Sequence, residues 1–216
     1  MIWLCALLIL ACLIGSLPLV IKNNHKTLHF LLAISAGIFI SIVSLHLIPE
    51  LPDGFQGHWF LLGFASILFA EKVIRKEDKN HTTSSITAFI GLSLHAFVAG
   101  LAIGTSPATL LAAVSLPMMI HKITEAMSLS SLLSLSLLSK RLSIILLGLF
   151  SLITPIGVLL SPYFSILVGH SIALELAAGT FMYVTTDIID EVFCKENKGY
   201  QVFIFFSLGI LLMIIL

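Results

Sequence analysis

Long apolar stretches separated by short polar segments constrain this chain more than any other feature. A helix needs roughly 20 apolar residues to cross the hydrocarbon core of a bilayer. No polar segment between the stretches is long enough to form a soluble domain. We therefore predict an all-α integral membrane protein in which residues 1–216 form one domain of eight transmembrane helices. The predicted spans cover approximately residues 2–21, 28–51, 58–75, 85–105, 108–134, 142–161, 167–192 and 200–216.

The composition supports this fold class. Hydrophobic residues make up 58% of the chain and charged residues 10%, whereas charged residues make up about 25% of a soluble domain. Eleven basic residues balance eleven acidic ones, so nothing in the net charge indicates a nucleic-acid partner. The three cysteines form no Cys-x-x-Cys motif and no disulfide framework. We expect the lipid bilayer to surround this chain, and we expect no nucleic acid to bind it.

The basic residues predict an orientation. Ten of the eleven lie in or beside the first, third, fifth and seventh connections between the predicted spans. Short loops rich in Lys and Arg remain in the cytoplasm, so both termini are expected outside, in a plasma or inner membrane. The ten residues are Lys22, Lys26, Lys72, Arg75, Lys76, Lys79, Lys140, Arg141, Lys195 and Lys198.

Four ionisable residues lie near the middle of two neighbouring spans. A charge at that depth is costly, so a functional role is the default hypothesis for such residues. His121 and Glu125 are four residues apart, so they share one helix face about 6 Å apart along the axis. An antiparallel neighbouring helix brings His95 to a similar depth. Two imidazoles and a carboxylate suit Zn²⁺ better than Ca²⁺ or Mg²⁺. We predict that His95, His121 and Glu125 bind a metal, although a single membrane histidine such as His95 equally fits a helix-packing hydrogen bond.

Two segments resemble the fourth- and fifth-helix signatures of the ZIP (Zrt-, Irt-like) divalent metal transporters. They read His-Ala-Phe-Val-Ala-Gly-Leu-Ala-Ile-Gly at 95–104 and His-Lys-Ile-Thr-Glu-Ala at 121–126, and residues 46–50, 154–157 and 178–191 resemble other helices of the family. The resemblance implies a ZIP-like bundle of eight helices with both termini outside. It also implies metal import towards the cytoplasm by alternating access, a site between the fourth and fifth helices, and a homodimer. No enzyme activity and no cofactor beyond the transported ion are expected.

The chain departs from this family at positions that bind a second metal in many members. The expected Asn of the fourth helix is Ala96, its acidic residue is Ala99, and the Glu before the sixth-helix proline is Thr154. Lys122 follows the fifth-helix histidine, where Asn, Asp or Glu is frequent. We hypothesise a mononuclear variant in which the Lys122 ammonium takes the place of the second ion.

The topology indicates entrance and exit residues. His46 and Glu50 lie near the outer end of the second span, where carboxylates concentrate cations. Asp187, Asp190 and Glu191 lie towards the cytoplasmic end of the seventh span, where they are placed to receive the ion. A solvated helix end is an equal explanation for the terminal acids of each set.

The function predicted from these residues is transport of a divalent cation. Zn²⁺ is the first expectation, and Fe²⁺, Mn²⁺ and Cd²⁺ are the other candidates, because affinity order alone does not fix selectivity. Two alternatives remain open from the sequence. One is a transport-inactive relative that senses metal or acts as a scaffold, and the other is an intramembrane metal-dependent hydrolase.

Overall fold

The computed structural model describes residues 2–20, 24–49, 51, 57–74, 81–105, 108–164, 170–193 and 199–215. Every regular element within these ranges is helical, and none of the described residues forms a strand. The described part is therefore all-α, as predicted. The elements are α1 (Ile2–Gly15), α2 (Leu17–Val20), α3 (His25–Ile42), the π-helical turn η1 (Val43–Leu47), α4 (His58–Ile74), α5 (His81–Thr105), α6 (Ala108–Leu135), α7 (Lys140–Phe164), α8 (His170–Phe193) and α9 (Gly199–Ile215).

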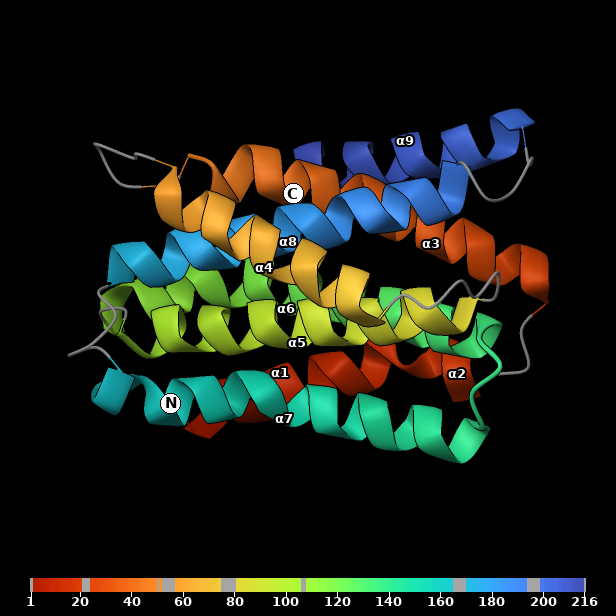
Figure 1. Cartoon of the computed structure of the whole chain (residues 1–216). Helices are drawn as coiled ribbons and strands as arrows, with labels where there is room; N and C mark the ends of the chain where they lie inside the picture. Colours follow the sequence, from red (N-terminus) through yellow and green to blue (C-terminus); the bar gives the residue numbers. More distant parts are fainter. Residues whose placement is uncertain are drawn as a thin grey trace.

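The long helices lie side by side and alternate in direction along the chain (Figure 1). In Figure 1, α5 and α6 occupy the middle of the bundle, with α1 and α7 below them and α3, α4, α8 and α9 above. The most extensive contacts join α5 to α7 and α8, α3 to α9, α4 to α8, and α1 to α6. The two helices that carry the predicted metal ligands are thus covered on both sides.

Glycines allow several of these helices to approach closely. A Cβ atom on Gly100 of α5 would overlap the backbone oxygen of Thr154 on α7, and a Cβ on Gly157 of α7 would overlap the backbone oxygen of Phe97 on α5. Small residues at helix contacts are typical of membrane proteins, because dispersion contacts between closely packed backbones replace the hydrophobic driving force. This crossing brings the backbone of Thr154 against α5 at Gly100, about one and a half turns from His95.

The outer surface is apolar and the interior contains polar side chains, the reverse of a soluble protein. Large apolar side chains such as Trp3, Phe69, Leu159 and Ile215 are more than 60% exposed. Buried polar side chains include serines and threonines on several helices, together with His95, Lys122 and Glu125. Such a surface is stable against lipid rather than water.

Four helical segments of the described residues are long and apolar enough to cross a membrane: His25–Leu45, Ser85–Gly104, Lys140–Phe164 and Ser171–Phe193. Trp3–Gly15 and Gly199–Ile215 are shorter apolar helices. The chain is a multi-pass membrane protein, and the predicted total of eight spans remains a prediction.

Several helix boundaries differ from the predicted spans, and two of the differences have a clear structural cause. The first span is interrupted at Ser16, because Pro18 has no amide hydrogen to continue the hydrogen bonding of α1. The fourth helix begins at His81 rather than at residue 85. The extra turn is stabilised by contacts with the end of α6: Thr82 Oγ1 accepts from the Leu137 amide at 3.2 Å, and Ser85 Oγ donates to the Leu132 carbonyl at 2.8 Å.

Candidate metal centre

The structure brings His95, His121 and Glu125 together inside the bundle. His121 and Glu125 project from one face of α6, and His95 projects from α5. His121 Nε2 lies 2.9 Å from Glu125 Oε1, His95 Nε2 lies 3.4 Å from the same oxygen, and the two Nε2 atoms are 3.2 Å apart. One potential ligand atom from each of the three residues lies within 4.8 Å of the others. His95 and Glu125 are each 1% exposed, so their donor atoms meet away from water.

The ring orientation of His95 is fixed by α8. His95 Nδ1 lies 2.9 Å from the Ala177 carbonyl oxygen. Because a carbonyl oxygen only accepts hydrogen bonds, this contact places the proton on Nδ1. The Nε2 lone pair of a neutral His95 then points at His121 and Glu125. A backbone carbonyl in this role is a common outer partner of a metal-binding histidine.

Phe181 of α8 forms an aromatic wall against both imidazoles. Its ring centroid lies 4.3 Å from that of His95 and 4.8 Å from that of His121. Phe181 is fully buried and also packs edge-on against Phe39 of α3 at 4.8 Å. The two histidine rings are therefore held by packing as well as by the hydrogen bond to Ala177.

Lys122 balances the buried carboxylate from the other side. Its Nζ donates to Glu125 Oε2 at 2.7 Å, and both side chains are buried. The ammonium also lies 4.2 Å from the centroid of the Phe150 ring on α7, a favourable cation–π position. Glu125 thus presents one oxygen to a cation of the protein and the other, Oε1, to the two imidazoles.

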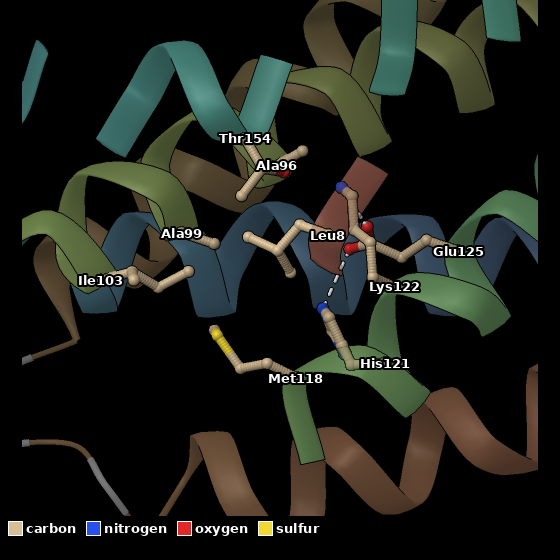
Figure 2. Close-up of a pocket in the computed structure, with 9 residues that line it drawn as sticks. All are labelled: Leu8, Ala96, Ala99, Ile103, Met118, His121, Lys122, Glu125 and Thr154. Carbon is tan, nitrogen blue, oxygen red and sulfur yellow. Dashed lines mark hydrogen bonds and ion pairs between the residues drawn. The ribbon is translucent and has the colours of Figure 1, made fainter. Parts of the chain in front are cut away.

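A small cavity of about 10 Å³ adjoins the cluster (Figure 2). The four positions at which the chain departs from the ZIP signatures all line it: Ala96 and Ala99 of α5, Lys122 of α6 and Thr154 of α7. His121 and Glu125 form part of the same wall, and Leu8, Ile103 and Met118 complete the lining. These substitutions are therefore neighbours in space, as the mononuclear hypothesis requires.

The arrangement has the chemistry of a site for one borderline divalent cation. Two imidazole nitrogens and one carboxylate oxygen form a ligand set found for Zn²⁺. Glu125 Oε1 is buried and lies 2.9 Å from His121 Nε2 and 3.4 Å from His95 Nε2. A buried carboxylate oxygen is costly unless a cation or a donor meets it. The three atoms thus converge on a position that favours a positive charge.

The predicted entrance and exit residues lie away from this cluster or outside the described residues. Asp187, Asp190 and Glu191 follow Phe181 along α8, about 9 to 15 Å further along the helix axis. Asp190 is exposed, Asp187 is half-buried and Glu191 is buried. His46 lies in the π-helical turn η1, and Glu50 lies outside the described residues.

Sequence reasoning missed the contribution of α8. Ala177 acts through its backbone carbonyl, and Phe181 carries no ionisable group, so a search for metal-binding side chains passes over both. Phe181 lies within the segment 178–191, which resembles a ZIP helix, but that resemblance assigns it no role.

Comparison with known proteins identifies the family. A family model described as ZIP zinc transporter matches residues 74–216, which is more than half of the chain and includes every residue of the cluster. No curated protein matches the chain. The cluster of potential metal ligands on α5 and α6 agrees with this match, and the chain belongs to the ZIP zinc transporter family, whose members are metal transporters and not enzymes.

Proposed function

We propose that this protein carries Zn²⁺ towards the cytoplasm by alternating access, through a mononuclear site made of His95, His121 and Glu125. Membership of the ZIP family makes divalent metal transport its general function. The proposal adds the ion, the site, the direction and the number of ions bound.

A single observation carries the proposal. Three donor atoms from two helices lie within 4.8 Å of one another in the middle of the bundle. The only hydrogen bond that the described residues make to the imidazole of His95 outside this cluster is the one from Nδ1 to Ala177. The three donor atoms otherwise contact one another, which is the arrangement that a shared cation requires.

The ligand chemistry supports Zn²⁺ and its neighbours over the alkaline-earth ions. Mg²⁺ and Ca²⁺ prefer shells made entirely of oxygen, whereas two of the three donors here are imidazole nitrogens. Fe²⁺, Mn²⁺ and Cd²⁺ are the competing cargoes, because first-row divalent metals share this ligand preference.

Lys122 takes the place of a second ion in this proposal. Its ammonium lies 2.7 Å from Glu125 Oε2, so the carboxylate bridges a fixed positive charge and the cargo. Ala96 and Thr154 offer no carboxylate to a second cation. One divalent ion and one ammonium therefore satisfy the carboxylate without further ligands.

The path follows from the predicted topology of eight spans with both termini outside. The starts of α3, α5, α7 and α9 lie at one end of the bundle together with the ends of α4, α6 and α8 (Figure 1), and Lys26, Lys72, Lys140 and Arg141 are exposed near that end. We assign it to the cytoplasm of a plasma or inner membrane. Asp187, Asp190 and Glu191 then lie on the exit side, with His46 and Glu50 at the entrance.

A homodimer is also proposed.

Ion flux into proteoliposomes tests this function. Purified full-length protein should move Zn²⁺ down its gradient faster than protein-free liposomes do, and Zn²⁺ should outcompete Mn²⁺. Well-folded protein that binds Zn²⁺ without moving it would indicate a metal sensor or scaffold instead. Cleavage of a lipid or peptide in detergent would indicate a metal-dependent hydrolase.

A further inference from the structure

The cavity beside the ligand cluster is the size of one water molecule. Its volume is about 10 Å³, close to the smallest space that holds a water. Five of the lining residues are apolar and four are polar: Leu8, Ala96, Ala99, Ile103 and Met118, and His121, Lys122, Glu125 and Thr154. Figure 2 shows these side chains around the space, with His121 and Glu125 at one edge of it.

The Thr154 hydroxyl behaves differently from other buried threonines. Thr124, Thr180 and Thr185 each donate to a carbonyl oxygen of their own helix, at 2.8, 2.9 and 2.8 Å. Thr154 is 3% exposed, and its Oγ1 has no hydrogen-bond partner among the described residues. A buried hydroxyl in that state costs free energy unless something in the adjoining space meets it.

Lys122 does not meet this hydroxyl. Its ammonium is held by Glu125 Oε2 at 2.7 Å and by the face of the Phe150 ring at 4.2 Å. The lysine therefore forms part of the cavity wall and leaves the space beside Thr154 to a small polar molecule.

We propose that one water molecule occupies this cavity, completes the coordination of the transported ion, and is held there by Thr154. This inference rests on the proposed function. Three protein ligands leave one position of a tetrahedral shell, and the cavity adjoins two of those ligands. The water gives a lone pair to the ion and donates one hydrogen to Thr154 Oγ1. Thr154 is thus a positioning residue that acts on the ion through this water.

The cavity also sets a selectivity rule. The cavity has room for about one water, so an ion bound beside it keeps few waters of its hydration shell on this side. Mg²⁺ dehydrates reluctantly and usually keeps several waters. The same cavity therefore disfavours Mg²⁺ on grounds of hydration, in addition to the ligand preference.

Co²⁺ binding to the purified full-length chain in detergent tests the inference. Co²⁺ is the probe because its visible absorption reports the coordination of the ion. Thr154→Val removes the hydroxyl at nearly constant volume and should weaken Co²⁺ binding about tenfold, the usual effect of losing an outer partner of a metal ligand, with a changed absorption spectrum. Thr154→Ser restores the hydroxyl and should return both affinity and spectrum close to those of the wild type. Thr185→Val, the same change at a buried threonine bonded to its own helix, serves as the matched control and should leave both readouts unchanged.

Two outcomes separate this inference from the proposed function. If Thr154→Val and wild type bind Co²⁺ with the same affinity and spectrum while His121→Ala loses binding, the metal site stands and the water held by Thr154 is wrong. If wild type and His121→Ala bind Co²⁺ equally, both proposals are overturned.

Discussion

Individual buried charges in α6 compensate one another within one turn. Lys122 and Glu125 are buried at 3% and 1% exposure, and removing one partner of a buried pair leaves an uncompensated charge that costs about 3–5 kcal/mol. In the proposed metal-bound state the ion would supply a second compensating charge on Glu125 Oε1. Lys122 therefore matters most when the ion is absent.

Replacing Lys122 by a neutral side chain of similar length tests this balance. Lys122→Met should lower the unfolding temperature of the metal-free protein, because Glu125 loses its cation. It should retain Zn²⁺ binding and gain more thermal stabilisation from Zn²⁺ than the wild type does, since the ion no longer competes with the ammonium. Thermal unfolding with and without Zn²⁺ measures both effects, with Ser131→Ala as a control in the same helix. A smaller stabilisation by Zn²⁺ in Lys122→Met would contradict the role of Lys122 as a substitute charge.

The aromatic wall gives a second prediction for a single residue. Phe181→Leu should weaken Co²⁺ binding several-fold and alter its absorption spectrum, because both imidazoles lose the ring that holds them. Phe39 is also fully buried and contacts Phe181, but no histidine ring contact involves it among the described residues. Phe39→Leu should therefore cost similar stability without changing the Co²⁺ spectrum, and equal spectral changes in the two variants would show that Phe181 acts only through general packing.

Among the residues of the site, the sequence predicts those that combine charge with an apolar neighbourhood. His95, His121, Lys122 and Glu125 stand out because ionisable groups are rare inside apolar helices. The Ala177 carbonyl does not stand out, because every residue has one and only the packing of α8 against α5 selects it. The cavity beside Thr154 depends on volumes contributed by four helices, which no local pattern reveals.

At the level of helices, the crossing of α5 and α7 decides where Thr154 lies relative to the ligands. A Cβ on Gly100 of α5 would overlap the backbone oxygen of Thr154 on α7. A Cβ on Gly148, which like Thr154 lies on α7, would meet nothing within 4 Å. The two glycines therefore form a matched pair for one substitution.

Gly100→Ala should destabilise the protein by about 1–3 kcal/mol, the usual cost of overpacking. Gly148→Ala should stabilise it by about 0.4–1 kcal/mol, because alanine restricts the unfolded chain without a clash. Thermal unfolding in detergent measures both changes. If the two variants shift the unfolding temperature in the same direction, the close contact between α5 and α7 is not the reason why a larger residue at position 100 destabilises the protein.

Helix boundaries depend on contacts that a hydropathy pattern does not contain. The polar residues before Ser85 resemble a loop by composition, yet they continue α5 because Thr82 and Ser85 bond to the end of α6. The interruption at Ser16 is readable from Pro18, whereas the π-helical turn at Val43–Leu47 has no such local signal.

At the level of the whole molecule, the alternating directions of the helices predict which connections share a side of the membrane. Ser139, in the connection between α6 and α7, and His58, the first residue of α4, are both exposed. That connection and the start of α4 lie at opposite ends of the bundle (Figure 1). In a variant without native cysteines, Ser139→Cys should react with a membrane-impermeant thiol reagent only from the cytoplasmic side. His58→Cys should react only from the outside. Labelling of both from one side would contradict the proposed topology.

The fold class was predictable because the long apolar stretches and the apolar composition can both be read directly from the sequence. The orientation was predictable only as a proposal, since it rests on where Lys and Arg lie rather than on any contact. The convergence of α5, α6 and α8 on one point required the three-dimensional packing, because the residues that meet there are separated by 26 and 82 positions in the chain.

In the proposed function, the ion that crosses the membrane is the one held by His95, His121 and Glu125. The most direct test compares the initial rate of Zn²⁺ uptake into proteoliposomes by wild type, His121→Ala, Glu125→Gln and the Ser131→Ala control. Zn²⁺ bound per chain is measured on the same preparations. We expect one bound ion and uptake in wild type and control, and loss of both in the two ligand variants. Two bound ions in the wild type, or uptake that survives in His121→Ala and Glu125→Gln, would contradict it.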